Sequence, residues 1–182
     1  MIISPTPLRD AAIIDLEKRE DERGFFARAW CRQELEAAGI DSRVVQANIG
    51  FCRERGTLRG LHYQTGPAAE QKWIRCIRGA VYDVIIDLRR ESPSYRQWYG
   101  AELTADNRRM LYVPKGFAHG YLSLEDNAEV YYLVSDVYSP GHEGGIRWDD
   151  PAFSIDWPIR NGLILSDKDR VWPDFDADTT TF

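Results

Sequence analysis

The stretch KWIRCIRGAVYDVIIDLR, residues 72–89, consists of two runs of apolar and β-branched residues separated by a turn. The runs are Lys72 to Arg78 and Ala80 to Arg89, and the turn is Arg78-Gly79. Runs of this length and composition, bounded by turn residues, are typical of β-strands. Residues 72–89 therefore predict two neighbouring strands, and the rest of the chain repeats the pattern.

Further strands are predicted on both sides of this pair, with turn residues at 92–93, 114–116 and 139–141. They are Arg43 to Ala47, Leu58 to Gln64, Met110 to Val113 and Glu129 to Val137. One helix is expected from Cys31 to Ala38, ended by Gly39. The tail after Gly162 is expected to form loops with a short helical turn. Many short antiparallel strands indicate an all-β sandwich or jelly roll with a few short helices.

The overall composition is that of one ordinary globular domain. The 182 residues include 43% apolar and 12% aromatic side chains, which is enough for a substantial core. No repeat, low-complexity tract or linker divides the chain, so residues 1–182 are expected to form one domain. The net charge of −6 argues against a nucleic-acid polymer as partner.

The sequence also carries information on cellular location. It has no run of about 18 apolar residues, so no membrane span is expected. The N-terminus MIISPTPLRD does not have the pattern of a signal peptide. The cysteines Cys31, Cys52 and Cys76 are odd in number and form no CxxC pair, which argues against a disulfide framework. A reducing cytoplasm is the expected location.

Strand alternation places three polar side chains on otherwise apolar faces. Alternate residues of a strand point to the same side, and a polar group among apolar neighbours needs a partner or a role. The three are Lys72 beside Ile74 and Cys76, Asp83 beside Val81 and Ile85, and Tyr132 beside Val130 and Val134. We therefore expect these three side chains to point into the interior of the fold.

The segment PKGFAH, residues 114–119, has the form PxGxxH. It resembles the second half-motif of the cupin superfamily, whose members are small jelly rolls, many of them with a metal held by three His and one Glu. The first half-motif requires HxH, but here the chain reads His62-Tyr63-Gln64. Only His119 and His142 remain, the latter in a Pro-Gly loop, and catalytic metal sites usually need three protein ligands. A cupin-like fold acting without metal or other cofactor is therefore expected.

The motif LRGLHYQ, residues 58–64, resembles the signature of the dTDP-4-dehydrorhamnose 3,5-epimerases. Other matching segments follow in order, and together they extend the resemblance over about residues 1 to 173. They are DERGFF at 21–26, QK at 71–72, DV at 83–84, DLR at 87–89, VPKGFAHG at 113–120, IRWDDP at 146–151 and LSDKD at 165–169. Several ordered motifs are far more specific than any one of them. The resemblance implies an isomerase that inverts C3 and/or C5 of a dTDP-linked 4-keto-6-deoxyhexose.

Inversion next to a ketone requires a base, a group that stabilises the enolate oxygen, and an acid on the opposite face. The resemblance implies that His62 is the base, Lys72 stabilises the enolate, and Tyr132 is the acid. Asp169 is expected to orient His62. Asp83 is a second candidate for a carboxylate paired with His62 or His119, and the sequence does not decide between the two carboxylates.

The resemblance also implies a set of substrate-binding residues. They are Arg23, Gln46, Asn48, Arg59, His119, Tyr138, Glu143 and Lys168. Arginine suits phosphate groups because of its bidentate geometry, and Tyr138 is placed to stack on the base. Strict alternation puts Arg59 and His62 on opposite faces of their strand, so we expect a bulge at Gly60 that brings both to the site.

Three positions depart from the family pattern, namely Arg28, Ile49 and Leu133. They leave open the nucleotide, the sugar, and whether one carbon or both are inverted. The alternatives are a single-carbon epimerase acting on a related sugar nucleotide, a sugar-nucleotide-binding cupin without turnover, and a metal cupin oxygenase. The resemblance further implies a homodimer, for which the strand edges at the N-terminus are a reasonable contact.

Overall fold

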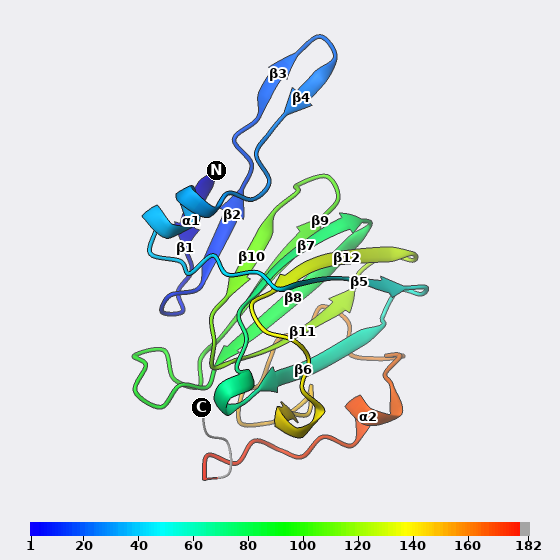
Figure 1. Ribbon diagram of the computed structural model, residues 1–182. Helices are drawn as coiled ribbons and strands as arrows, with labels where there is room; N and C mark the ends of the chain where they lie inside the picture. The colour runs from blue at the N-terminus through cyan, green and yellow to red at the C-terminus, as the bar shows by residue number, and fades with distance from the viewer. Residues whose placement is uncertain (179–182) are drawn as a thin grey trace.

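The structure, a computed structural model, describes residues 1–178 as two antiparallel β-sheets that face each other (Figure 1). The six-stranded sheet has the order β1-β2-β10-β7-β12-β5, and the five-stranded sheet has the order β13-β6-β11-β8-β9. The first sheet comprises β1 Ile2–Pro5, β2 Ala12–Asp15, β10 Met110–Val113, β7 Lys72–Arg78, β12 Ala128–Val134 and β5 Gln46–Cys52. The second comprises β13 Glu143–Gly145, β6 Leu58–Gln64, β11 Phe117–Ser123, β8 Ala80–Asp87 and β9 Trp98–Thr104. The predicted all-β sandwich is confirmed.

The main core lies between the two sheets and is built by alternate residues of their strands. Ile74 and Val130 of the six-stranded sheet and Val81 and Ile85 of the five-stranded sheet belong to one cluster, and all four are 0% exposed. Fully burying a residue of this size contributes about 1.5–3 kcal/mol. The alternation that the sequence predicted for β7, β8 and β12 is therefore confirmed by which side chains meet.

Each sheet is also covered on its outer face. Trp73 of β7 packs with Leu35 of helix α1 (Arg32–Ala37) over the six-stranded sheet. Ile86 of β8 packs with Phe153 and Trp157 from the C-terminal segment over the five-stranded sheet. Because both faces of these central strands are covered, every residue of β11 and all but one of β8 are buried.

Several element boundaries differ from the sequence-based expectation. Strands β6, β7 and β10 have the expected bounds, and the expected helix is present as α1. The strand expected at residues 43–47 is instead β5, residues 46–52, where polar Gln46 and Asn48 and the glycine at 50 obscured the strand pattern. Strands β1, β2, β9 and β11 were not predicted, because their composition is mixed or contains His and Gly. The tail up to residue 178 has one short helix, α2 Asp167–Arg170, as expected.

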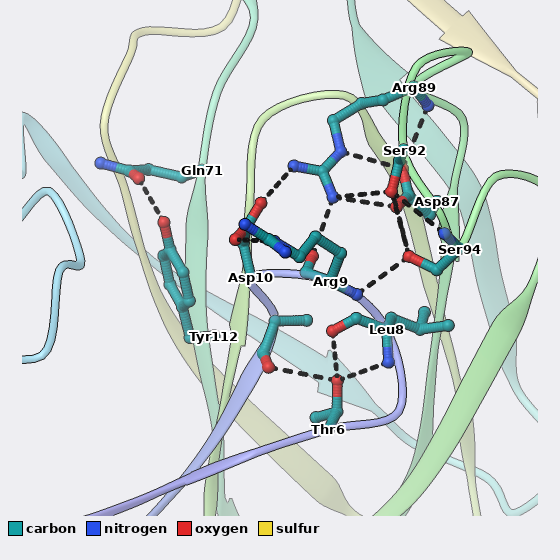
Figure 2. A network of polar contacts seen from close by, with 11 residues as sticks. Thr6, Leu8, Arg9, Asp10, Gln71, Asp87, Arg89, Ser92, Ser94 and Tyr112 are labelled. Carbon is teal, nitrogen blue, oxygen red and sulfur yellow. Dashed lines mark hydrogen bonds and ion pairs between the residues drawn. The ribbon is translucent and has the colours of Figure 1, made fainter.

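A buried carboxylate fixes the N-terminal loop to the β8–β9 connection (Figure 2). Asp87, 0% exposed, accepts hydrogen bonds from Arg89 Nε at 2.9 Å, Ser92 Oγ at 2.5 Å and Ser94 Oγ at 2.7 Å. Arg89 also donates to the Arg9 carbonyl and pairs with Asp10, both at 2.8 Å. Burial opposes ionisation of Asp87, but these hydrogen bonds lower the pKa of its carboxyl group below the usual range.

A separate two-stranded hairpin, β3 Arg19–Asp21 and β4 Gly24–Phe26, projects away from the two sheets (Figure 1). Phe26 on this hairpin is 72% exposed. Isolated two-stranded hairpins are marginally stable in water, and an exposed large aromatic side chain on one is unusual for a surface that stays in solvent. Within the described residues, no helix is long and apolar enough to cross a membrane.

Candidate active site

Two neighbouring hollows, with volumes of about 350 and 400 Å³, are lined by residues from both sheets. Both are lined by His62, Lys72 and Tyr132, so these three side chains stand where the hollows meet. We refer to the pair of hollows as the cavity. Gln46, Asn48, Tyr138 and Glu143 line one hollow, and Arg59, His119, Lys168 and Asp169 line the other.

The wall formed by the six-stranded sheet is set by the register of three strands. Tyr132 lies opposite Asn48 of β5 and opposite Ile74 of β7. Lys72 lies opposite Val134, two residues beyond Tyr132 on the same face. Lys72 and Tyr132 are thus diagonal cross-strand neighbours, a relation in which Cβ atoms are about 7 Å apart. Asn48 accepts a hydrogen bond from Gln46 Nε2 at 2.7 Å, which fixes both amides beside Tyr132.

The wall formed by the five-stranded sheet depends on an irregularity in β6. His62 pairs with His119, but Arg59 pairs with Tyr121, so the register shifts by one residue between the two pairs. The shift places Arg59 and His62 on the same side of the strand, and both line the cavity. The bulge predicted at Gly60 is confirmed.

Gly60 is required at this bulge for two reasons. Its φ of 110° lies in a region that side chains with a Cβ rarely adopt. A Cβ at this position would also lie 2.7 Å from the Cα of Gly120 and 2.7 Å from the carbonyl oxygen of His119. The close approach of β6 to β11 therefore determines how His62 is presented to the cavity.

His62 is held by Asp169, which reaches it from α2. His62 Nε2 lies 2.5 Å from Asp169 Oδ1, and the Asp169 side chain is 6% exposed. Ser166 caps α2 by accepting a hydrogen bond from the Asp169 backbone N–H at 3.1 Å, and Trp172 Nε1 donates to Asp169 Oδ1 at 3.3 Å. Burial opposes ionisation of Asp169, yet the interaction with His62 and these donors lower the pKa of its carboxyl group.

The second carboxylate that the sequence left open is bound to the other histidine. Both oxygens of Asp83 lie 3.0 Å from His119 Nε2, and Asp83 is 0% exposed. His62 therefore pairs with Asp169 and His119 with Asp83. Because each imidazole has its Nε2 next to a carboxylate, each ring is fixed in orientation.

Lys72 has a partner that the sequence analysis did not identify. Its Nζ lies 3.1 Å from Glu70 Oε1, and the two side chains are 12% and 11% exposed. Glu70 lines the same hollow as His62 and Tyr132. It precedes β7, so strand alternation gave no indication of where its side chain points.

The cavity's lining contains four basic groups that are each paired with a carboxylate. The pairs are His62–Asp169, His119–Asp83, Lys72–Glu70 and Lys168–Glu143. Arg59 differs from them, because in the described part of the chain it forms no ion pair and donates instead to the Phe51 carbonyl at 3.0 Å. An arginine without a carboxylate partner is the cation in this lining best placed to receive an anionic ligand.

At the mouth of the cavity, Tyr138 donates a hydrogen bond to Glu143 at 2.7 Å, and Lys168 also binds this carboxylate. Tyr138 is 55% exposed, so its ring is accessible to a planar ligand group. Burial opposes ionisation of Glu143, but Lys168 and Tyr138 lower the pKa of its carboxyl group.

Of the twelve residues predicted for the site, eleven line the cavity and one does not. Arg23 lies on the projecting β3–β4 hairpin, where its side chain is 83% exposed and pairs with Asp21 at 2.6 Å. Because the hairpin projects away from the two sheets, the Arg23 side chain does not reach the cavity of its own chain. Among residues 1–178, no group of three or more His, Cys, Asp or Glu side chains is arranged to hold a metal ion.

Comparison with known proteins gives the family. A family model described as dTDP-4-dehydrorhamnose 3,5-epimerase matches residues 5–177. The chain belongs to the dTDP-4-dehydrorhamnose 3,5-epimerase family. A curated family member from Methanothermobacter thermautotrophicus is 43% identical over 169 residues, which are 92% of this chain and 90% of the relative.

Solved structures of family members agree with this assignment. The dTDP-4-dehydrorhamnose 3,5-epimerase of Bacillus anthracis, with TDP and PPi bound, is 43% identical, with a TM-score of 0.91 over 96% of this chain and 99% of that one. ChmJ of Streptomyces bikiniensis, described as a 3'-monoepimerase in complex with dTDP-quinovose, is 32% identical, with a TM-score of 0.85 over 93% and 86%. The predicted family, its cupin-like fold and the isomerase class are confirmed.

The three departures from the epimerase family pattern have different positions. Ile49 lines the cavity beside Arg59 and is 65% exposed. Leu133 packs against the Trp73 cluster on the outer face of the sheet, away from the cavity. Arg28 is outside the cavity and pairs with Glu34 at the start of α1. Ile49 is therefore the departure that borders the site of this chain.

Proposed function

We propose that this protein is a dTDP-4-dehydrorhamnose 3,5-epimerase that converts dTDP-4-dehydro-6-deoxyglucose into dTDP-4-dehydro-L-rhamnose by side-chain chemistry, without a metal or other cofactor. The observation that carries the proposal is the position of the base and the acid. His62 belongs to the five-stranded sheet and Tyr132 to the six-stranded sheet, and both line one cavity. A sugar ring between them has one face toward each residue.

His62 acts as the base. Its Nε2–H donates to Asp169, which leaves the lone pair on Nδ1 to accept the proton from C3 or C5. Asp169 remains ionised and stabilises the imidazolium that forms. As the C–H bond breaks, its electron pair forms a carbon–carbon double bond to C4, and the ketone oxygen becomes an enolate.

Lys72 stabilises the enolate oxygen, and Tyr132 completes the inversion. The ammonium of Lys72 stands beside both reacting groups and supplies a positive charge where negative charge develops. The enolate then collapses to the ketone, and the carbon takes a proton from the Tyr132 hydroxyl on the opposite face. Burial raises the pKa of Tyr132, so the hydroxyl is protonated before reaction. Transfer of a proton from the imidazolium to the phenolate through solvent restores both residues.

The remaining residues of the cavity bind the nucleotide. Arg59, with no carboxylate partner among the described residues, binds the diphosphate together with Lys168. Tyr138 stacks on the base, while Gln46 and Asn48 bind the nucleoside. Glu143 holds Tyr138 and Lys168 in position, and His119, fixed by Asp83, lines the sugar pocket.

We further infer that residues 1–182 act as one cytoplasmic domain and form a homodimer. The exposed Phe26 of the β3–β4 hairpin and the free edge of β1 are surfaces that a second copy can cover. Arg23 lies on this hairpin outside the cavity of its own chain, so its role in substrate binding requires the dimer. Sedimentation of the wild type and a Phe26→Asp variant tests this, with a dimer expected for the first and a monomer for the second.

The function is tested by product analysis. The enzyme is incubated with dTDP-4-dehydro-6-deoxyglucose, the 4-ketone is reduced with borohydride, and the released sugars are identified by NMR. Rhamnose among the products requires inversion at both carbons and supports the proposal. Recovery of a sugar inverted at C3 or C5 alone would establish the single-carbon alternative and direct attention to Ile49. Recovery of sugars with the original configuration would contradict epimerase activity on this substrate.

A further inference from the structure

Among the described residues that line the cavity, Glu70 is the acidic group that takes no part in the proposed proton transfers or in nucleotide binding. Its carboxylate is 3.1 Å from Lys72 Nζ, and its side chain is 11% exposed. Burying a carboxylate costs free energy unless it is paired, and the pairing with Lys72 offsets that cost for Glu70. The same pairing restricts where the flexible Lys72 side chain can point.

The position of Lys72 matters because an ammonium stabilises a developing charge only when it is held near that charge. Lysine has four rotatable bonds and loses much rotamer freedom when it is fixed. Lys72 is the first residue of β7, where strand pairing orders its backbone but leaves the side chain free. The contact with Glu70 supplies the missing restraint.

Glu70 also acts on Tyr132. Burial is the largest cause of the raised pKa of the Tyr132 phenol, and the negative charge of Glu70 is the second. The positive charge of Arg59 lowers this pKa. The other titratable groups that line the two hollows are His62, Tyr63, Lys72, His119, Tyr121, Tyr138, Glu143, Lys168 and Asp169. Tyr121 is a buried phenol whose own pKa is raised, chiefly by desolvation. Of the other carboxylates in this lining, Asp169 is bound to His62, and Glu143 is bound to Lys168 and Tyr138.

We propose that Glu70 is a positioning residue that orients the Lys72 ammonium toward the enolate oxygen. This rests on the proposed epimerase function. Glu70 does not contact the reacting carbons. It acts through Lys72, which it holds by an ion pair. Loss of its charge should therefore affect turnover and the ionisation of Tyr132, with little effect on nucleotide binding.

The first test compares Glu70→Gln with Glu129→Gln. The first substitution keeps the size of the side chain and a hydrogen-bond acceptor for Lys72 but removes the charge. Glu129 lies on β12 and pairs with Arg78 at 3.8 Å, outside the cavity, so its variant is the matched control. For Glu70→Gln we expect kcat to fall by about 10-fold, because removal of one donor to a developing oxyanion costs about 10²–10³-fold and Lys72 would be displaced but not lost. The Kd for dTDP should change less than 3-fold, and the control should match the wild type.

The second test does not depend on turnover. Tyrosine labelled with ¹³C at Cζ is titrated by NMR, with Tyr132→Phe identifying the Tyr132 signal. The Tyr132 titration should move to lower pH in Glu70→Gln and stay in place in Glu129→Gln. A Tyr132 titration and a kcat that are both unchanged in Glu70→Gln would overturn the proposal. If the wild type lacks epimerase activity, the proposed function fails, while the titration still decides whether Glu70 acts on Tyr132.

Discussion

His62 Nε2 and Asp169 Oδ1 are 2.5 Å apart, although the two residues are separated by 107 positions in the chain. The fold brings them together by placing α2 of the C-terminal segment against β6. Asp169 is nearly buried and keeps its charge because His62, Ser166 and Trp172 bind it. The pairing defines the tautomer of His62 and thereby the nitrogen that can accept a proton.

Replacing Asp169 by Asn should keep the shape of this pair but remove the charge that stabilises the imidazolium. We expect the epimerisation rate to fall by about 10²–10⁴-fold, the usual contribution of a general base. Circular dichroism and thermal melting should remain close to the wild type, because an amide can accept the same hydrogen bonds. A variant that is folded and retains full activity would show that Asp169 does not support the base. The Asp167→Asn variant, two positions earlier on the same short helix, is the matched control.

Tyr132→Phe should remove the acid without disturbing the fold. Proton abstraction by His62 remains possible, so we expect residual exchange of solvent hydrogen but at least a 100-fold slower inversion. Tyr131→Phe is the control, since Tyr131 is next in sequence and does not line the cavity. Equal inversion rates for the two variants would show that Tyr132 is not the acid. Because burial and then Glu70 raise the pKa of Tyr132, the alkaline fall in wild-type kcat should begin above about pH 10, the reference value for tyrosine.

Gly60→Ala should damage the site through the backbone. The new Cβ would lie 2.7 Å from two backbone atoms of β11, at a positive φ that costs about 1–3 kcal/mol for a residue with a Cβ. We expect a loss of stability of at least this size, measured by denaturant unfolding, and a loss of activity because Arg59 and His62 are displaced. Gly141→Ala is the control, since its Cβ would meet nothing within 4 Å and its φ is not positive. A stable, fully active Gly60→Ala protein would contradict the role of the bulge.

Arg59→Ala should weaken nucleotide binding. Hydrogen bonds to charged groups contribute about 1.5–3 kcal/mol, so the Kd for dTDP should rise by about 10- to 150-fold. Isothermal titration calorimetry provides the measurement. Arg78→Ala is the matched control, because Arg78 is a surface residue whose ion pair with Glu129 is 3.8 Å long and should contribute little. Similar affinities for the two variants would argue that the diphosphate is bound elsewhere.

Asp87→Asn should lower stability without changing the chemistry, because Asp87 does not line the cavity. Its hydrogen bonds to Arg89, Ser92 and Ser94 predict a cost of about 2–3 kcal/mol at pH 7. The folded-state pKa of Asp87 is lowered, so its stabilisation is present above the unfolded pKa of about 3.9 and is lost as pH falls through the folded pKa. The difference between wild type and variant should be constant from about pH 5 to pH 8 and shrink below about pH 4. A difference that grows in acid would contradict this assignment.

Period-two alternation was sufficient to predict the inward orientation of Lys72, Asp83 and Tyr132. It could not predict β11, FAHGYLS, because the strand carries a histidine and a glycine whose roles depend on the neighbouring strands. It also could not assign Asp83 or Asp169 to a histidine, since that pairing is set by the register of β6 with β11 and by the position of α2. Such contacts between distant segments are fixed by the tertiary structure.

Two other residues show the same limit. Glu70 lies before the start of β7, so strand alternation could not predict the direction of its side chain. Its place in the cavity is evident only from the ion pair with Lys72. Arg23 matched a family motif, but its position on the projecting hairpin separates it from the cavity of its own chain. A motif can thus predict a role for a residue without predicting where the fold places its side chain.

The most direct test of the central claim is solvent-hydrogen incorporation. The enzyme is incubated with dTDP-4-dehydro-6-deoxyglucose in D2O, and deuterium at each carbon is followed by NMR and mass spectrometry. The account predicts deuterium at both C3 and C5 with the wild type, and its loss at both carbons in a His62→Ala variant that remains folded. Undiminished exchange in that variant, or no exchange with the wild type, would contradict the assignment of His62 as the base of a 3,5-epimerase.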